Sequence, residues 1–287
     1  KYFCSLYILT INYQAMKTSR ILNVKILSLF ILTFFIFIDV VSAQDQNFGG
    51  TRIRVIAAGD TGFVVQPPHQ ASHGRRPVVW YAPTIGKYPN INTVWILERL
   101  VKKGFWVCGI NVGESWGSPK GRKVYSAFYD TIMSRFHLDR KVCLIPQSRG
   151  GLMLYCWAEE PGNAVKVSRI AGIYPIGDFM SNPGLEKTAK FWDMDPAELK
   201  AHVADHNPID RLQTLKDAGV KIFHIHGDAD VAVPLEPNSR TLINRYKAMG
   251  GDGTLLVIPG KGHAEIPEYF HSKVFLKFLL AELKEKR

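Results

Sequence analysis

Short, almost wholly apolar runs alternate along this chain with longer segments of helical periodicity, and this alternation constrains the fold more than any other feature. These runs lie at 77–82, 105–110, 142–145, 168–173, 221–226 and 255–258, and those at 168–173 and 221–226 also contain polar residues. Helical patterns lie between or after them at 93–103, 124–136, 239–249 and 268–283. Strands that are apolar throughout are buried on both faces, as in parallel sheets covered by helices. With an opening antiparallel pair at 52–56 and 63–65, the pattern predicts an α/β fold whose mostly parallel sheet has about eight strands and helices on both faces.

Ser148 stands where one of these strands turns directly into a helix. The run at 142–145 is followed by Pro-Gln-Ser-Arg-Gly-Gly and then by an apolar helical segment. In a nucleophile elbow, this sharp turn lifts a serine hydroxyl above the sheet and points the first helix amides at a developing oxyanion. Gly150 and Gly151 supply the small residues needed on the helix side, while Pro146 replaces the usual glycine on the strand side. Taken alone, the motif also fits an ordinary helix N-cap.

Two residues that lie later in the chain, an aspartate and a histidine, are candidate partners of this serine. Asp230 lies in the loop His-Gly-Asp-Ala-Asp-Val-Ala-Val-Pro that follows the strand at 221–226. His263 ends the sequence Pro-Gly-Lys-Gly-His, which follows the strand at 255–258. A carboxylate at the end of a strand can orient the imidazole that activates a serine. Each member follows a strand in a loop rich in glycine or proline, so the sequence predicts a catalytic triad of Ser148, Asp230 and His263.

In these motifs the chain resembles the α/β-hydrolase superfamily, especially its prolyl-oligopeptidase-like and dienelactone-hydrolase-like members. The resemblance covers the chain from Arg52 to the C-terminus. It rests on the sequences at 147–151, 226–234 and 260–263. It implies the α/β-hydrolase fold and serine hydrolase chemistry, with the aspartate shortly before the Val-Pro step, Asp230, as the acid. Asp228 is then a loop-capping residue, and Asp178, which also follows a strand, is the alternative acid.

The resemblance also implies a mechanism. His263 takes the proton of Ser148 as the serine attacks an acyl carbonyl, and it then protonates the leaving group before water releases the acyl-enzyme. One oxyanion donor is expected to be the backbone N–H of Arg149. The second is expected in the loop after the strand at 77–82, at Thr84 or Ile85, although this loop lacks the His-Gly pair that is usual there.

Residues in the loops at the predicted catalytic edge give the only clue to the substrate. The basic residues in these loops are Lys87, Arg149 and Lys261, and the aromatic residues in the same or neighbouring loops are Tyr88, Trp116 and Phe179. Together they would form a positive, aromatic-lined mouth that suits an ester on an acidic or glycan substrate. Alternatively, Arg149 pairs with Glu114 or Asp178 and no net positive field remains. Glu114 itself is either a substrate contact or a cap of the following turn. We therefore predict Glu114, Trp116 and Lys87 as substrate-binding candidates.

The segment 180–212 interrupts the alternation of strands and helices. It contains Asn-Pro-Gly, a helix start at Asp195 and Asn-Pro-Ile-Asp. In a hydrolase fold, an insertion here is either a short cap over the site or a helical excursion without a role in substrate choice, and the sequence leaves both open.

The first part of the chain has the composition of a targeting segment. Basic residues from Met16 precede an apolar stretch, and Val-Ser-Ala then offers a cleavage site before Gln44. This order predicts a secretory signal peptide at 16–43, with 1–15 as an over-extended start and 44–287 as a single hydrolase domain. The apolar stretch is shorter than the roughly 20 residues that a membrane span needs. We therefore expect a secreted or periplasmic protein without a stable membrane anchor after cleavage.

Composition and the absence of certain motifs argue against several other classes of function. The net charge is +11, but lysine and arginine are scattered, which favours a soluble basic surface over nucleic-acid binding. No phosphate loop or dinucleotide fingerprint occurs, so no cofactor is expected. His69 and His73 are weak grounds for a metal site, and none is predicted. Cys108, Cys143 and Cys156 lie in apolar stretches and are expected to be buried free thiols.

Three functions compete on these grounds. A secreted serine hydrolase that cleaves a carboxylic ester, on a small molecule or a glycan, is the first prediction. A prolyl-oligopeptidase-type serine peptidase is the alternative, although such enzymes usually carry a large propeller domain for which this sequence has no room. A binding module on a hydrolase scaffold is the third, and it would be expected to have lost Ser148 or His263.

Overall fold

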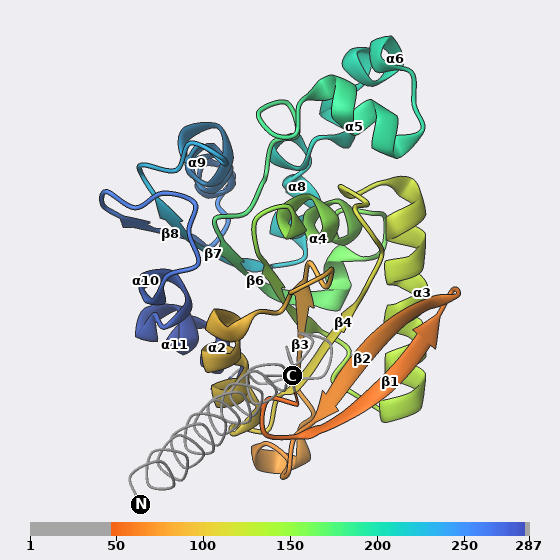
Figure 1. Cartoon of the computed structure of the whole chain (residues 1–287), viewed down its shortest axis with the longest axis vertical. Coiled ribbons are helices and arrows are strands. Elements are labelled where there is room, and N and C mark those ends of the chain that lie inside the picture. Colours follow the sequence, from red (N-terminus) through yellow and green to blue (C-terminus); the bar gives the residue numbers. More distant parts are fainter. Residues whose placement is uncertain (1–46, 285–287) are drawn as a thin grey trace, which may run out of the picture. The chain divides into compact units, whose positions relative to one another are not determined.

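The fold is organised around one eight-stranded sheet. The computed structural model describes residues 47–284, which belong to the compact unit 43–287. The predicted signal peptide and over-extended start lie outside the described residues. The strands are β1 (Thr51–Ala57), β2 (Asp60–Gln66), β3 (Val78–Ala82), β4 (Trp106–Ile110), β5 (Val142–Pro146), β6 (Val167–Ile173), β7 (Lys221–Gly227) and β8 (Gly253–Ile258), in the order β1-β2-β4-β3-β5-β6-β7-β8 (Figure 1).

The direction of the strands places their ends as the sequence predicts. β1 and β2 pair in an antiparallel way, β2 pairs antiparallel with β4, and all other pairs are parallel. β3, β4, β5 and β6 are buried at every position, as expected for strands covered on both faces. The carboxyl ends of β3 to β8 therefore meet at one edge of the sheet, where ligands bind in open α/β folds.

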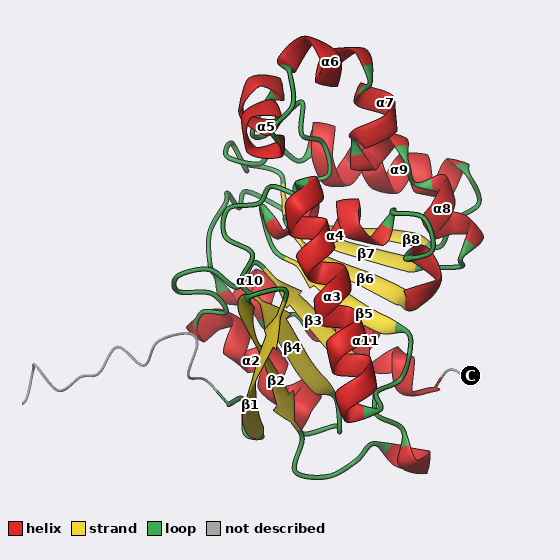
Figure 2. Cartoon of the chain, turned by 90° about the vertical axis from the view of Figure 1, so that its right-hand side faces the viewer, coloured by secondary structure: helices red, strands yellow, loops and turns green. Residues whose placement is uncertain are grey.

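Helices cover both faces of the sheet. Apolar residues of α3 (Pro119–Phe136), α4 (Gly150–Ala158), α8 (Gln213–Asp217) and α9 (Thr241–Ala248) share one hydrophobic cluster with the strands. Those of α2 (Ile91–Val101), α10 (Pro267–Phe270) and α11 (Lys273–Leu280) share a second cluster. Figure 2 shows α3 and α4 lying across the strands on the first of these faces. The predicted α/β architecture, a mostly parallel eight-stranded sheet with helices on both faces, is confirmed.

Several helix boundaries differ from the predictions, and at two of them short-range capping is the reason. α3 begins at Pro119 rather than at residue 124, since the Ser118 side chain accepts a hydrogen bond from Gly121 N–H and starts the helix in a polar first turn without apolar periodicity. The helix expected at 268–283 is divided between α10 and α11. Ser272 caps the second piece by accepting from Phe275 N–H, so the chain restarts there.

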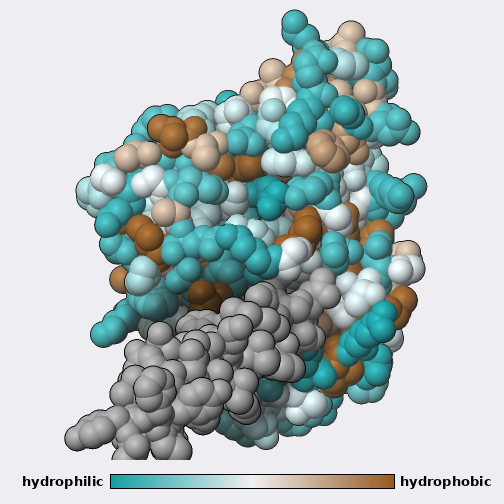
Figure 3. Space-filling model, viewed as in Figure 1, coloured by the Kyte–Doolittle hydropathy of each residue, from teal (hydrophilic) through white to brown (hydrophobic). Residues whose placement is uncertain are grey.

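The insertion 180–212 folds into three short helices, α5 (Leu185–Trp192), α6 (Pro196–Ala201) and α7 (Val203–His206). Asp195 caps α6, at the helix start that the sequence predicts. Buried residues of α5 and α6 pack with residues of α4 and with Trp116 in a third hydrophobic cluster. Within residues 47–284, no helix has the length and apolar character needed to cross a bilayer. Figure 3 shows polar and apolar side chains interspersed on the face turned to the viewer.

The edge of the sheet opposite the carboxyl ends of the strands holds a group of charges, which we call the ion cluster: buried Arg169 and Glu282 and half-buried Arg75 and Asp139. Arg169 Nε lies 3.0 Å from Glu282 Oε2, and both side chains are 1% exposed. Arg75 Nη2 lies 3.2 Å from Glu282 and 2.8 Å from Asp139. Two guanidinium groups thus face two carboxylates. Together they join the last described turn, which contains Glu282, to β6 and to the segments that lead into β3 and β5.

Candidate active site

Ser148 occupies the tight turn between β5 and α4, with a backbone φ of +52°. This left-handed conformation is unfavourable for a serine and marks a functional turn. Glycine is required at the next-but-one position and the one after it, because a side chain there would overlap neighbouring backbone atoms. A Cβ on Gly150 would lie 2.2 Å from the carbonyl oxygen of Ala82, and one on Gly151 would lie 2.2 Å from that of Ile176. The predicted nucleophile elbow is therefore formed, with the loop after β3 in direct contact with the start of α4.

Gln147, the residue before the serine, supports the elbow from below. Its buried side chain accepts a hydrogen bond of 2.6 Å from Tyr81 OH and donates one of 3.1 Å to Tyr174 OH. The ring of Tyr174 in turn lies 4.4 Å from the ring of His263, centre to centre. Neither tyrosine could be identified as a site residue from the sequence, because each lies at a strand end without a motif of its own.

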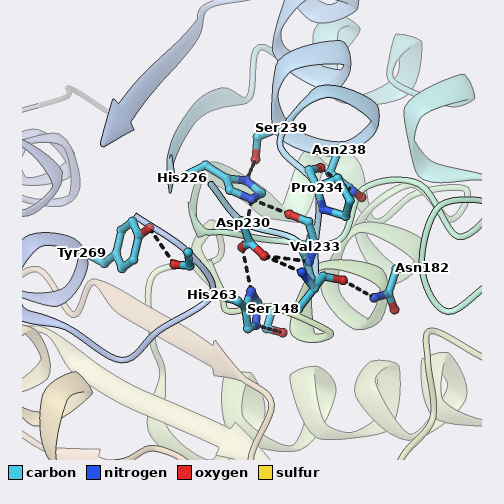
Figure 4. Close-up of polar contacts among 12 residues, drawn as sticks. Ser148, Asn182, His226, Asp230, Val233, Pro234, Asn238, Ser239, His263 and Tyr269 are labelled. Carbon is cyan, nitrogen blue, oxygen red and sulfur yellow. Dashed lines mark hydrogen bonds and ion pairs between the residues drawn. The ribbon is translucent and has the colours of Figure 1, made fainter. Parts of the chain in front are cut away.

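The three predicted triad residues converge at the carboxyl edge of the sheet. Ser148 Oγ lies 2.9 Å from His263 Nε2, and His263 Nδ1 lies 2.8 Å from Asp230 Oδ2 (Figure 4). Since the carboxylate accepts hydrogen bonds, Nδ1 carries the proton and Nε2 is free to accept the serine proton. The His263 side chain is 25% exposed, whereas that of Asp230 is fully buried. This is the geometry of a Ser-His-Asp triad.

Hydrogen bonds hold Asp230 in its ionised form. Its Oδ1 accepts from the backbone N–H groups of Ala232 and Val233 at 3.0 and 2.8 Å. Burial by itself raises the pKa of the Asp230 carboxyl, but hydrogen bonds from two histidines and a backbone N–H outweigh burial and hold that pKa well below its usual range. A carboxylate that stays charged can stabilise an imidazolium on His263.

The other candidate carboxylates are engaged elsewhere. Asp228 Oδ1 accepts from Gly260 N–H at 2.6 Å, which is the loop-capping role that the sequence analysis gave it. Asp178 Oδ1 accepts from Met180 N–H at 2.9 Å and from the Asn207 side chain at 2.8 Å. The structure thus brings Asp230, and not Asp178, to His263.

Two side chains outside the motifs fix the loops that carry the triad. Tyr269 OH donates to the carbonyl oxygen of Gly262 at 2.9 Å, next to His263. Asn182, from the insertion, donates to the carbonyl oxygen of Ala232 at 2.6 Å, in the loop of the catalytic acid. The insertion therefore touches the triad loop. Whether it also acts as a cap in substrate choice stays a prediction.

Backbone donors are available for an oxyanion. Among residues 47–284, the N–H groups of Arg149, Thr84 and Ile85 donate to no protein acceptor. Arg149 opens α4 directly after the nucleophile, and the close contact of Gly150 with Ala82 brings the loop of Thr84 against it. This arrangement supports Arg149 as one donor and Thr84 as the second, while Ile85 lies one residue farther along and packs against the core.

The charged substrate candidates are paired. Arg149 Nη1 lies 2.5 Å from Glu114 Oε1, which corresponds to the alternative in which this pair leaves no net positive field. Lys87 Nζ lies 3.4 Å from Glu265 Oε1, and Tyr88 OH donates to the same oxygen at 2.6 Å. Glu265, two residues after His263, was not identified from the sequence. Only its place in the loop of the catalytic histidine could have indicated it.

Trp116 lies in the cluster between α4 and the insertion. It is 8% exposed, its carbonyl oxygen accepts from Trp192 Nε1 at 2.9 Å, and Lys187 lies over its ring. The residue has a φ of +48°, so the chain turns sharply beside it. The structure thus places Trp116 mainly in packing, and its predicted contact with substrate stays a prediction.

A cavity of about 480 Å³ opens beside the expected oxyanion loop. It is lined by Arg52, Arg54, Thr61, Gly62, Phe63, Thr84, Tyr88 and Asn111. Thr84 is 6% exposed, and its Oγ1 has no hydrogen-bond partner in the described part of the chain. The cavity therefore connects the oxyanion loop with two arginines of the edge strand.

Metal-ligating side chains and cysteine thiols are the other groups whose arrangement bears on chemistry. No group of three or more His, Cys, Asp or Glu side chains within 47–284 is arranged to hold a metal ion. Cys108, Cys143 and Cys156 are buried and form no disulfide within residues 47–284. Burial raises the pKa of the Cys108 thiol well above its usual value and that of the Cys156 thiol to about 12. These two thiols are therefore not nucleophiles at neutral pH.

Comparisons with known proteins identify the fold. No family model and no curated protein matches the chain. Acylaminoacyl peptidase from Pyrococcus horikoshii superposes with a TM-score of 0.64 at 15% identity, over 83% of this chain and 42% of that chain. A puromycin-hydrolyzing peptidase from Mycobacterium tuberculosis gives 0.60 at 14% identity, over 83% of this chain and 39% of its own. Est1E from Butyrivibrio proteoclasticus gives 0.60 at 16% identity, over 82% of this chain and 100% of its own.

The chain therefore adopts the α/β-hydrolase fold. It spans less than half the length of the two peptidases, whereas it matches Est1E over the whole of that chain.

Proposed function

We propose that this protein is a serine hydrolase that cleaves carboxylic esters through an acyl-enzyme. The observation that carries the proposal is the continuous line of hydrogen-bonding contacts from Ser148 Oγ through His263 to Asp230, at 2.9 and 2.8 Å. The strained turn at Ser148 and the open backbone N–H groups beside it add the two other requirements of acyl transfer, an exposed nucleophile and an oxyanion site.

The mechanism follows from these contacts. His263 Nε2 removes the proton of Ser148 as Oγ bonds to the carbonyl carbon, and the N–H groups of Arg149 and Thr84 stabilise the oxyanion. The resulting imidazolium is held by ionised Asp230 and returns its proton to the leaving alcohol. Water then attacks the acyl-enzyme with His263 again as base, which releases the acid and restores Ser148.

An ester is the substrate class that demands least of this site. A triad able to cleave an amide also cleaves the more reactive ester, whereas the converse does not hold. The structural neighbours include both Est1E and two peptidases, so a peptidase of the prolyl-oligopeptidase type is the second candidate. Est1E supports the first candidate because its full length is matched.

The cavity beside Thr84 suggests which esters fit. Its lining combines two guanidinium groups, from Arg52 and Arg54, with hydroxyl and amide groups and includes no carboxylate among the described residues. Such a lining favours a substrate part that carries a carboxylate or several hydroxyls. We propose an acidic small-molecule or glycan ester, with the charge placed in this cavity rather than at Arg149.

The test compares p-nitrophenyl esters of graded acyl length with proline p-nitroanilides, followed by acetylated, feruloylated and methyl-esterified glycans. Ester turnover that disappears in Ser148→Ala and His263→Ala, with unchanged circular dichroism, is the expected result. Turnover of the anilides alone would favour the peptidase. Wild-type rates in either variant would remove the proposed roles, and no turnover by the wild type would favour a binding module.

We also propose export of the protein through the segment 16–43, which leaves a mature chain that begins at Gln44. Expression of the full sequence with secretion machinery, followed by mass spectrometry of the N-terminal peptide, tests this. A product that retains residue 16 in the cell fraction would contradict it.

A further inference from the structure

A second histidine contacts the catalytic carboxylate. His226 lies at the end of β7 and is fully buried. Its Nε2 lies 2.9 Å from the carbonyl oxygen of Val233 and 3.3 Å from Asp230 Oδ2. His263 Nδ1 lies 2.8 Å from the same Oδ2. One carboxylate oxygen is therefore shared by two imidazoles, which Figure 4 shows on opposite sides of Asp230.

The partners of His226 define where its proton lies. A carbonyl oxygen and an ionised carboxylate only accept hydrogen bonds, so Nε2 carries a proton. The other ring nitrogen, Nδ1, lies 2.8 Å from Ser239 Oγ. Ser239 is fully buried, and its hydroxyl has a single proton to give.

The contacts continue beyond Ser239 into the core. His224 Nδ1 lies 2.9 Å from the same Ser239 Oγ, and His224 Nε2 lies 2.7 Å from Tyr155 OH. His224 is fully buried. Burial, with a smaller effect of neighbouring His226, lowers the pKa of the His224 imidazole to about 3. This ring is therefore neutral near pH 7, and it donates from one nitrogen and accepts at the other.

With one ring proton on each histidine, a single arrangement of protons satisfies every contact in this series. Tyr155 OH donates to His224 Nε2, and His224 Nδ1–H donates to Ser239. The hydroxyl of Ser239 then donates to His226 Nδ1, so that His226 Nε2–H points at Asp230. In the reverse direction the Tyr155 proton would have no acceptor in the series, and the contact between Ser239 Oγ and His226 Nδ1 would have no proton.

We propose that His226 is a positioning residue of the triad, whose Nε2–H holds Asp230 Oδ2 and limits how much of the carboxylate charge acts on His263. Tyr155, His224 and Ser239 keep the His226 proton on Nε2. Chains of hydrogen bonds in a buried environment polarise one another, so the members act together. The proposal rests on the proposed function only in taking Ser148, His263 and Asp230 as the working triad.

Among the described groups that face the two imidazoles, Asp230 is the charged one in direct contact with both. Around His263 these are Ser148 and the ring of Tyr174, and Tyr269 OH is bound to the adjacent Gly262 carbonyl. The charged side chains of its own loop are paired, Lys261 with Glu268 and Glu265 with Lys87. Around His226 they are Ser239, the carbonyl of Val233 and the ring of Tyr174.

A change in pH dependence follows from the shared oxygen. Without the His226 N–H, more of the Asp230 charge acts on His263 and favours its protonated form. The enzyme then loses its general base at a higher pH. The acidic limb of the kcat/KM profile, which reports the free enzyme's essential base, moves upward. A residue that only fills space in the core would lower the amount of folded enzyme and leave this limb in place.

The experiment measures kcat/KM for one p-nitrophenyl ester from pH 4.5 to 9 in the wild type, Ser148→Ala, His226→Leu, His226→Gln and Ser239→Ala. Leucine keeps the volume without a donor, and glutamine restores an N–H near the position of Nε2. Ser168→Ala is the matched control, because Ser168 is a buried serine at the amino end of β6, bonded to the carbonyl oxygen of Val142.

We expect the acidic limb to rise by about 0.5 to 1 pH unit in His226→Leu, by less in Ser239→Ala, and to return toward the wild-type position in His226→Gln. Ser168→Ala keeps the wild-type profile. If His226→Leu does not fold, Ser239→Ala decides. An unshifted limb in the folded variants overturns the inference, even if their rates fall. Activity that survives in Ser148→Ala overturns the proposed function instead, so the two failures are distinguished.

Discussion

Two buried polar groups lie at opposite edges of the same sheet, and they are built differently. The ion cluster pairs the guanidinium groups of Arg169 and Arg75 with two carboxylates. At the carboxyl edge, Asp230 instead meets two imidazoles and two backbone N–H groups. Guanidinium groups keep their charge at every accessible pH, whereas imidazoles change theirs near neutrality. The first arrangement suits a fixed junction, and the second suits a site where protons move.

The largest expected effect comes from breaking the carboxyl-edge group at its carboxylate. Asp230→Asn keeps the shape of the side chain but no longer stabilises an imidazolium on His263. We expect kcat to fall by about 10⁴-fold, as for loss of the acid in other triads. Steady-state ester kinetics provide the measurement, and a fall of less than tenfold in a folded variant would show that Asp230 is not the acid.

The second largest effect comes from breaking the ion cluster. Arg169→Leu removes one partner of buried Glu282 and leaves a carboxylate without its 3.0 Å contact. Breaking a buried pair in this way costs about 3–5 kcal/mol of the free energy of unfolding. Urea unfolding measures this loss, and kcat of the folded variant should be unchanged.

The matched control is Arg240→Ala, which breaks the exposed pair of Arg240 with Glu236 and should cost about 1 kcal/mol or less. Equal losses in Arg169→Leu and Arg240→Ala would contradict the structural role given to the ion cluster.

A smaller effect concerns the pH dependence of stability. The pKa of the His224 imidazole is about 3 in the folded protein, because of burial, and about 6.5 when unfolded. Between these values the unfolded chain binds a proton that the folded protein does not. The free energy of unfolding therefore falls as the pH drops from 6.5 toward 3, by up to about 1.4 kcal/mol per pH unit from this group. His224→Gln should flatten the curve in urea unfolding at pH 7 and 4.5. A parallel curve would show that His224 is not buried in a neutral form.

The smallest expected effect lies at the cavity beside Thr84. Arg54→Gln should raise KM for a hemisuccinate p-nitrophenyl ester several-fold and leave that for the butyrate ester unchanged, because only the former has a carboxylate to bind. Lys103→Gln removes the same charge outside the lining of the cavity and is the control. An equal change in KM for both esters in Arg54→Gln would argue against an anion-binding role.

Much of the fold and of the triad could be predicted because the signals are local. The apolar runs define buried strands, and Gly150 and Gly151 define the elbow by the space they leave. The chain order of the serine, the acid and the histidine then places them at one edge. Ser118 and Ser272 show why the helix ends could not be predicted equally well, since a single side-chain hydrogen bond fixes each.

The surroundings of the triad could not be predicted because they depend on contacts between distant segments. Ser239 meets His226 only once the helix after β7 folds back on its own strand. Asn182 reaches the acid loop from the insertion, 50 residues away. Glu265 and Tyr88 meet across 177 residues. Ser239, Glu265 and Tyr88 belong to no motif, and the motifs that contain His226 and Asn182 do not indicate their partners, so these contacts became visible only through the packing of the sheet.

The central claim is that Ser148 is a nucleophile activated by His263. Reaction with diethyl p-nitrophenyl phosphate, followed by mass spectrometry of peptides, tests it most directly, because the reagent phosphorylates an activated serine. We predict one stable adduct per chain, on the peptide that contains Ser148, and its loss in Ser148→Ala and His263→Ala. An adduct on another residue, or equal labelling of the His263→Ala variant, would contradict the account.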